Sequence, residues 1–388
     1  NLDATLRWPE SLTAWRTLGL NTVPLFARWV KSEDQVRVEA FLDACRRQGF
    51  RIMNIDSPFH QMMERHRRSP EIYCQWEGGG HGDQMCPSYR GAFYREEIER
   101  LAEQTARVKA DLLSCDIELF GGVQTYAQKC SRCRADFEKS GGADWNEWCL
   151  RKGEEMWRDL SAAVRSRPGM SGIDLGGYDF RPGANYQNIW PVDRLYPQAM
   201  QNTQVSTYTP LYPYHLELIG DEVRTDRAKL PQSDILPWLT PGDAGVFPGA
   251  AFRYALLECF ANGARGLHFW SGRLWDTELL AAYARVIRNV GPVEDIIVDG
   301  DLLTGAAAAP PARLSGLRHG DQMFLLVADY WKSLGTKTVQ VTVPVAVASR
   351  VIDLDTGRDV ALVEPDRNSF PVDLDREPAR VFHVRPKE

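Results

Sequence analysis

From the N-terminus to about residue 295, short runs of apolar β-forming residues alternate with longer stretches of helical periodicity. The helical spacing of apolar positions predicts helices over 9–18, 39–48, 95–110, 145–165 and 249–262. The β-rich runs between them predict seven strands, over 23–30, 50–59, 112–120, 171–179, 205–212, 235–240 and 265–270. Such regular alternation predicts a parallel sheet with crossover helices.

One further strand would close this sheet into a (β/α)8 barrel. The chain opens with the helix over 9–18, so we expect the first barrel strand to lie before or at Asn1, or to be irregular. An open, doubly wound sheet is the structural alternative. It is disfavoured because no glycine-rich phosphate-binding loop follows any strand. Residues 1–300 are therefore interpreted as a (β/α)8 barrel of the TIM type.

The pattern changes after an alanine run at 306–309 that is followed by Pro310 and Pro311. Beyond it the apolar residues predict only strands, over 323–328, 338–343, 350–354, 359–363, 369–374 and 379–384. The segment Asp355-Thr-Gly357 has the composition of a turn. Residues 312–388 are therefore predicted to form a small antiparallel β-sandwich.

Charge and composition exclude some partners. The formal net charge of -6 leaves no basic surface for nucleic acid. No apolar run reaches the roughly 18 residues that a membrane span needs. Because the first residue is Asn and no leader precedes it, we expect the natural N-terminus to have been removed. The 8 cysteines fit disulfides or a metal, so the compartment stays open, with a secreted or periplasmic location favoured. The oligomeric state is not indicated.

The strand over 112–120 carries the most informative polar residues. By the period of two, Ser114, Asp116 and Glu118 share one face, with the two acids nearest the carboxyl end. Functional residues of parallel barrels gather at that end. Two neighbouring carboxyl groups raise the pKa of one of them, so that Glu118 could donate a proton at neutral pH. The alternative is that Glu118 is a solvated acid at the end of a strand.

The segment Asp111-xx-Ser114-x-Asp116-x-Glu118 resembles the DxxDxDxE signature of chitinase-type barrels, with Ser in place of the middle Asp. The resemblance implies that Glu118 is the general acid/base and that Asp116 orients the acetamido group of the substrate, which acts as nucleophile. Many retaining glycosidase barrels also carry their acid/base Glu at the end of strand four, which is the number of this strand if the missing strand is the first.

Cysteines provide a second resemblance. Cys130 and Cys133 follow the same strand as a CxxC motif, and Cys86 lies in the long loop after the preceding strand. This arrangement is similar to the zinc cluster of the β-galactosidases of glycoside hydrolase family 42, with Cys74 or Cys149 as fourth ligand. It implies a structural zinc and no cofactor for catalysis. A disulfide and free thiols are the other interpretations.

The sequence also departs from family 42. Those enzymes carry Asn before the acid/base and a nucleophilic Glu on strand seven, whereas here Ile117 precedes Glu118 and the segment 235–243 contains no Glu. A substrate-assisted mechanism, or Asp116 as nucleophile, would explain the absence.

Other polar and aromatic residues at strand ends suit a sugar cleft. The predicted substrate-binding residues are Trp29, Asp56, Tyr178, Asp179, Tyr208, Trp238, Asp243 and Trp270. Chitinase-type families use a Tyr on strand six and a Trp on strand eight, which the resemblance assigns to Tyr208 and Trp270. Packing within the barrel is the structural alternative for each residue.

The sequence thus predicts a glycoside hydrolase that cleaves an O-glycosidic bond of an oligo- or polysaccharide. A barrel that binds glycans without cleaving them is the alternative. A barrel enzyme of other chemistry is disfavoured, because the sequence has no HxH or HExxH motif.

Overall fold

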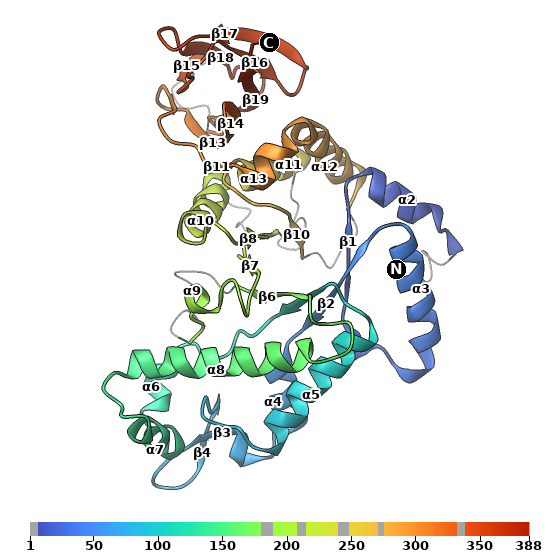
Figure 1. Ribbon diagram of the computed structural model, residues 1–388, viewed down its shortest axis with the longest axis vertical. Coiled ribbons are helices and arrows are strands. Elements are labelled where there is room, and N and C mark those ends of the chain that lie inside the picture. Colours follow the sequence, from blue (N-terminus) through green and yellow to red (C-terminus); the bar gives the residue numbers. More distant parts are fainter. Residues whose placement is uncertain are drawn as a thin grey trace. The chain divides into compact units, whose positions relative to one another are not determined.

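The computed structural model describes residues 7–179, 189–207, 215–239, 248–270, 275–331 and 338–387. The chain forms two compact units (Figure 1), unit 1 over residues 1–204 and unit 2 over residues 205–388, and each is described by itself.

Unit 1 is built on parallel strands that neighbour one another in chain order. They are β1 (Thr22–Leu25), β2 (Arg51–Asp56), β5 (Leu112–Cys115), β6 (Asp174–Tyr178) and β7 (Asn202–Gln204). The register pairs Met53 with Leu112 and Asp56 with Cys115, so the carboxyl ends of β2 and β5 are level. The predicted alternation of parallel strands and helices is confirmed here.

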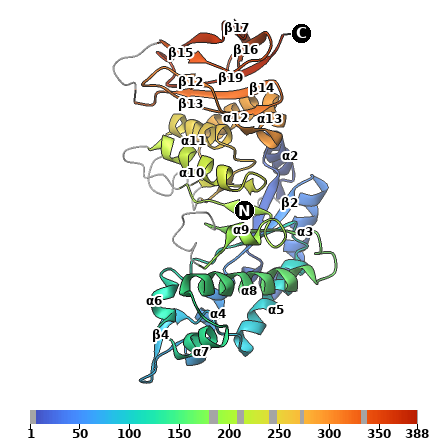
Figure 2. The ribbon, with the colours of Figure 1, turned by 60° about the vertical axis from the view of Figure 1, so that its left-hand side comes forward.

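Long amphipathic helices connect these strands. They are α3 (Gln35–Arg47), α5 (Ala92–Arg107) and α8 (Trp145–Arg165). The same unit also contains the shorter helices α2 (Glu10–Thr17), α4 (Pro58–Arg65), α6 (Val123–Ala127), α7 (Ser131–Lys139) and α9 (Val192–Leu195). Helix α8 begins where the Asp144 side chain caps the Asn146 amide at 2.8 Å, and α5 lies beside it (Figures 1 and 2). A side chain at Gly153 would collide with the Ile189 carbonyl, so glycine permits close packing at this point of α8.

A short hairpin, β3 (Tyr73–Gln75) with β4 (His81–Met85), lies between α4 and α5 in the chain.

The strands of unit 1 are shorter than predicted at their carboxyl ends. Strand β1 ends at Leu25 and a turn of 3-10 helix, η1 (Ala27–Trp29), follows it. Strand β5 ends at Cys115, because its neighbour β2 ends at Asp56 and the bond from Asp116 N to Asp56 O, 2.8 Å long, is the last backbone bond between them. The strand predicted over 205–212 is wrong in position: β7 ends at Gln204, and residues 208–212 lie outside the described residues.

Unit 2 begins with the helices α10 (Leu216–Lys229), α11 (Gly249–Ala261), α12 (Thr277–Val290) and α13 (Glu294–Asp299), and with short strands β8 (Asp234–Ile235), β9 (Trp238–Leu239) and β10 (His268–Phe269). Strands β9 and β10 pair in parallel. Within the described residues, no helix of either unit has the length and apolarity to cross a bilayer.

The rest of unit 2 is antiparallel. One sheet has the order β11 (Asp301–Leu302), β13 (Arg313–His319), β14 (Gln322–Ala328), β19 (Ala379–Pro386), β16 (Ser349–Asp353), β17 (Arg358–Val363), and the other has β12 (Ala307–Ala308), β15 (Thr338–Thr342), β18 (Ser369–Asp373). Apolar side chains from both sheets, among them Leu325, Val341 and Phe370, form one buried core. The predicted antiparallel sandwich is confirmed, and it includes strand β13, which the sequence pattern did not reveal. The domain boundaries given above stay a prediction.

Candidate active site

Asp116 and Glu118 follow directly after β5, at the carboxyl edge of the parallel sheet of unit 1. The strand before them is buried along its whole length, and Ile117 between them is also fully buried. Ile117 therefore anchors the segment, while Asp116 is half-buried and Glu118 is exposed. This alternation directs the two acids away from the core.

The two carboxyl groups interact with each other. Although the Glu118 side chain is partly exposed, the surrounding protein desolvates its carboxyl group in part. This desolvation, the Asp116 carboxylate and then Asp179 raise the pKa of Glu118 to about 7. Burial also raises the pKa of Asp116, although His60, Ser57, Glu118 and Arg28 act to lower it. The interaction between the two carboxyl groups raises the pKa of Glu118 and lowers that of Asp116, which favours a proton on Glu118.

Residues that follow β2 hold this pair from one side. The Ser57 hydroxyl donates to Asp116 Oδ2 at 3.3 Å, and the Glu118 amide donates to His60 Nε2 at 3.1 Å. The other oxygen of Asp116, Oδ1, is buried and has no hydrogen-bond partner among the described residues.

Asp56, predicted to bind substrate, lies at the end of β2 with 0% exposure. Arg100 of α5 donates to both of its oxygens, at 2.7 and 3.0 Å, and Arg28 Nη1 lies 3.7 Å from Oδ1. A buried carboxylate held by two arginines is satisfied without a ligand. In this structure Asp56 orients Arg28 and Arg100, and its contact with substrate stays a prediction.

Trp29 lies in η1 with 63% of its surface exposed. Its ring stacks on Phe26 at 4.2 Å, and the Arg28 guanidinium lies 4.9 Å from the Trp29 ring centroid. An exposed indole held flat by its neighbours suits stacking against the apolar face of a sugar.

Tyr178 ends β6, and Asp179 follows it with φ 54°. Phe120, two residues after Glu118, has φ 74° and is buried against Trp190. Positive φ is uncommon for residues other than glycine and is found often at functional sites. Asp179 contributes to the raised pKa of Glu118, so the structure brings these two predicted residues together.

The remaining predicted residues belong to unit 2. Trp238 in β9 is buried, with its ring 4.7 Å from that of His268, and Trp270 after β10 is 49% exposed. Tyr208 and Asp243 lie outside the described residues.

Four buried cysteines of unit 1 form a candidate metal site. The sulfur atoms of Cys74, Cys86, Cys130 and Cys133 all lie within 4.8 Å of one another, with Cys86 Sγ 3.8 Å from Cys130 Sγ and 3.5 Å from Cys133 Sγ. A tetrahedral ion with bonds of about 2.3 Å needs sulfur separations of about 3.8 Å, so the residues fit one. All eight cysteines are described and none forms a disulfide, and Cys149 is not in the cluster.

The pKa values of two thiols of this cluster, Cys86 and Cys130, are lowered, whereas neighbouring thiols raise the pKa values of Cys74 and Cys133. Hydrogen bonds from neighbouring thiols, first from Cys133, lower the pKa of Cys130, and the Gln75 amide donates to Cys130 Sγ at 3.3 Å. Both effects stabilise a thiolate, which is the form that binds metal.

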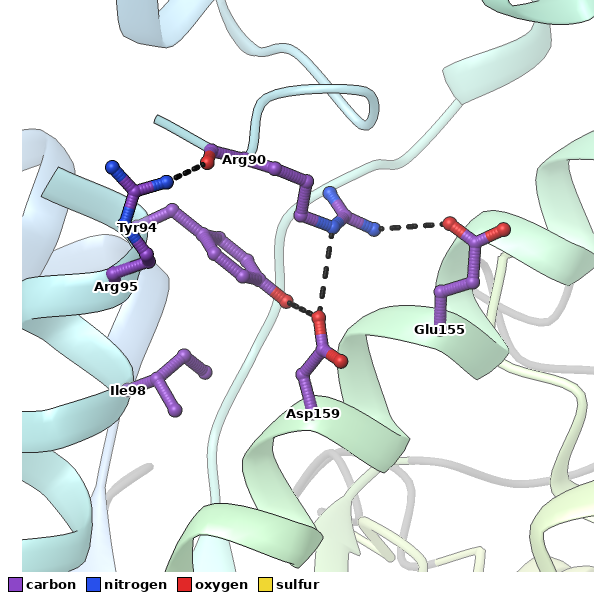
Figure 3. A pocket seen from close by; sticks show the side chains of 6 residues that line it. All are labelled: Arg90, Tyr94, Arg95, Ile98, Glu155 and Asp159. Atoms are coloured by element: carbon purple, nitrogen blue, oxygen red, sulfur yellow. Dashed lines mark hydrogen bonds and ion pairs between the residues drawn. The ribbon is translucent and has the colours of Figure 1, made fainter. Parts of the chain in front are cut away.

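A separate hollow of about 530 Å³ lies between α5 and α8 and contains none of the predicted residues (Figure 3). Its polar groups are paired among themselves: Tyr94 donates to Asp159 at 2.9 Å and Arg90 to Glu155 at 3.4 Å. We assign no function to it.

The sequence interpretation missed the contacts of Ser57 and His60 with the acid pair, and it did not decide between Cys74 and Cys149. Both contacts join residues more than fifty positions apart. These contacts could have been predicted from the rule that adjacent parallel strands end at the same edge of the sheet. That rule places the residues after β2 beside those after β5.

Comparison with known proteins gives structural matches alone, since no family model and no curated protein matches the chain. A GH42 β-galactosidase from G. stearothermophilus matches with a TM-score of 0.59 and 9% identity, over 99% of this chain and 97% of that one. A maltogenic α-amylase from Thermotoga neapolitana matches with a TM-score of 0.56 and 12% identity, over 97% and 93%. A GH36 α-galactosidase from Geobacillus stearothermophilus matches with a TM-score of 0.55 and 9% identity, over 99% of this chain and 53% of that one.

These matches confirm the predicted fold and the resemblance to glycoside hydrolase barrels at the level of fold. The chain has the same (β/α)8 barrel fold as these structures, followed by an antiparallel β-sandwich.

Proposed function

We propose that this protein hydrolyses an O-glycosidic bond of an oligo- or polysaccharide, with Glu118 as general acid/base. The observation that carries the proposal is the Glu118 carboxyl group, exposed at the carboxyl edge of the sheet, with its pKa raised to about 7 beside Asp116. A carboxyl group that keeps its proton near neutral pH can protonate a leaving oxygen. The glycosidase barrels with the same fold support this reaction class.

In the proposed reaction Glu118 donates its proton to the glycosidic oxygen as the bond to the anomeric carbon breaks. Glu118, now ionised, then takes a proton from the incoming water. Asp116 would accept a hydrogen bond from the protonated Glu118 and bear the negative charge of the pair. Asp116 would either attack the anomeric carbon or orient a substrate N-acyl group that does so. Both routes retain the anomeric configuration.

The exposed Trp29 ring is proposed to stack against a sugar unit beside this pair. Tyr178, Asp179, Tyr208, Trp238, Asp243 and Trp270 are retained as proposed substrate contacts.

The four clustered cysteines are proposed to hold a structural zinc ion, which would join the β3–β4 hairpin to the start of α7. The ion would supply folding energy and no step of the reaction.

The test compares the wild type with Glu118→Gln on a panel of nitrophenyl glycosides and on oligosaccharides. Loss of general acid catalysis should lower kcat/KM by about 10²–10⁴-fold. Glu103→Gln, an exposed acid on α5, is the matched control and should keep full activity. Near-normal turnover by Glu118→Gln would refute the assignment. Glycan binding without turnover by the wild type would favour a non-catalytic barrel instead.

A further inference from the structure

The segment that bears Glu118 extends beyond the strand pairing that fixes β5. The last backbone bond between β2 and β5 runs from Asp116 N to Asp56 O. Two residues later, the Glu118 amide donates to a side chain, His60 Nε2, at 3.1 Å. The His60 side chain therefore replaces the backbone acceptor that a continuing strand would offer to the amide of Glu118, the proposed acid.

His60 is well placed to do this because its helix is rigidly anchored. Helix α4 begins at Pro58, directly after Ser57, and Phe59 and Met62 on its inner face have no exposed surface. The Phe59 ring stacks on Tyr94 of α5 at 5.6 Å. The anchored first turn fixes both the Ser57 contact with the Asp116 side chain and the His60 contact with the Glu118 backbone.

We propose that His60 is a positioning residue that holds the Glu118 backbone, and with it the acid, in its place next to Asp116. This inference rests on the proposed function of Glu118. His60 can accept the amide proton only as the neutral ring protonated on Nδ1. Protonation of Nε2 would replace the acceptor by a donor and break the bond.

The charges around His60 favour the neutral form. The charged groups that face it are Asp116 after β5 and Arg28 in η1. Burial and Arg28 lower the pKa of His60, and together they outweigh the opposite effect of Asp116. The charged groups Glu97 and Arg100 of α5, which packs against α4, are paired with other residues: they bond to each other, and Arg100 also bonds to Asp56.

Two variants separate the hydrogen bond from the bulk of the side chain. His60→Phe keeps a ring but loses the acceptor, whereas His60→Gln puts an amide oxygen where Nε2 lies. Each is assayed on the phenyl and the dinitrophenyl glycoside of the sugar that the wild type cleaves fastest. His66→Gln, at the end of the same helix, is the matched control and should leave activity unchanged.

A misplaced acid should slow the bond-breaking step, which kcat/KM reports, only for substrates whose leaving group needs protonation. The later proton transfer from water is common to both substrates and does not enter kcat/KM. We expect His60→Phe to lower kcat/KM on the phenyl glycoside about tenfold and to leave kcat/KM on the dinitrophenyl glycoside within about twofold. His60→Gln should restore most of the loss. Equal losses on both substrates, or no rescue by Gln, would refute the positioning role. If Glu118→Gln itself shows no dependence on the leaving group, the proposed function fails; if it does and His60→Phe does not, this inference alone fails.

Discussion

Replacing Asp116 by Asn should lower the pKa of Glu118, and this change can be measured directly. In the structure burial is the first cause of the rise from the ordinary 4.5 to about 7, and Asp116 adds to it both by its charge and by its hydrogen bond. The amide of Asp116→Asn would carry no charge, so two of the causes disappear while burial and Asp179 remain. The pKa of Glu118 should therefore move down to a value between 4.5 and 7.

The size of the effect on activity follows from the fraction of Glu118 that holds its proton. With a pKa of about 7, half of the acid is protonated at that pH, and kcat/KM should fall about tenfold for each further pH unit well above it. In Asp116→Asn this alkaline limb should begin at lower pH. Asp179→Asn is the matched comparison, and it should shift the limb in the same direction by less, because Asp179 is the weaker charge influence on Glu118.

The assay is the pH profile of kcat/KM on a phenyl glycoside. Because Asp116→Asn removes a proposed catalytic group, a second measurement titrates the Glu118 carboxyl by NMR in protein labelled on glutamate, with Glu118→Gln to assign the signal. The reasoning is refuted if Glu118 titrates at the same pH in Asp116→Asn as in the wild type.

Two further predictions concern the metal and the stability of unit 2. Cys86→Ser should reduce the zinc content from about one ion per chain to a small fraction of that, and it should lower the thermal unfolding temperature. Cys149→Ser changes a buried cysteine outside the cluster and should retain the ion. Elemental analysis measures the zinc content, and calorimetry measures the unfolding temperature. Burial raises the pKa of Glu258, which has no exposed surface, to about 7. The folded state therefore binds more protons than the unfolded state between pH 4.5 and 7, and the free energy of unfolding should fall by about 3 kcal/mol as pH rises through that window. Glu258→Gln should flatten this dependence in denaturant titrations, and an unchanged slope would contradict the assignment to Glu258.

The part of the site that lies on a single element could be predicted from the sequence. Asp116 and Glu118 are separated by the buried Ile117, and the apolar run before them is a strand, so their position at a strand end follows from local pattern alone. The predicted strand was too long, because its end depends on where its neighbour β2 stops. That information is not contained in the residues 112–120 themselves.

Strand β7 shows why local pattern fails elsewhere. Its residues Asn202, Thr203 and Gln204 are polar and fully or almost fully buried, so no apolar periodicity marks them as a strand. They are tolerated because Ser114 donates to Gln204 Oε1 at 2.6 Å and Gln204 Nε2 donates to Asn202 Oδ1 at 2.9 Å. Gly176 in β6 leaves the space that these side chains fill. A buried polar strand is recognisable only once its partners are known.

That Cys74 is the fourth cysteine of the cluster also depends on contacts between distant segments, and the same segments carry the candidate active site. The chain leaves β2 through His60 and reaches Cys74 after α4; it leaves β5 through Glu118 and reaches Cys130 after α6. The segment from β2 to Cys74 and the segment from β5 to Cys130 are joined near their starts by the hydrogen bond between His60 and Glu118. They meet again at the cluster that contains Cys74 and Cys130. A metal ion bound by the cluster would close these two segments into one loop and remove much of their conformational freedom. Because Glu118 lies on that loop, a fixed cluster would limit how far the acid can move from Asp116. This gives a structural metal site a physical reason to lie on the same segments as the proposed catalytic pair.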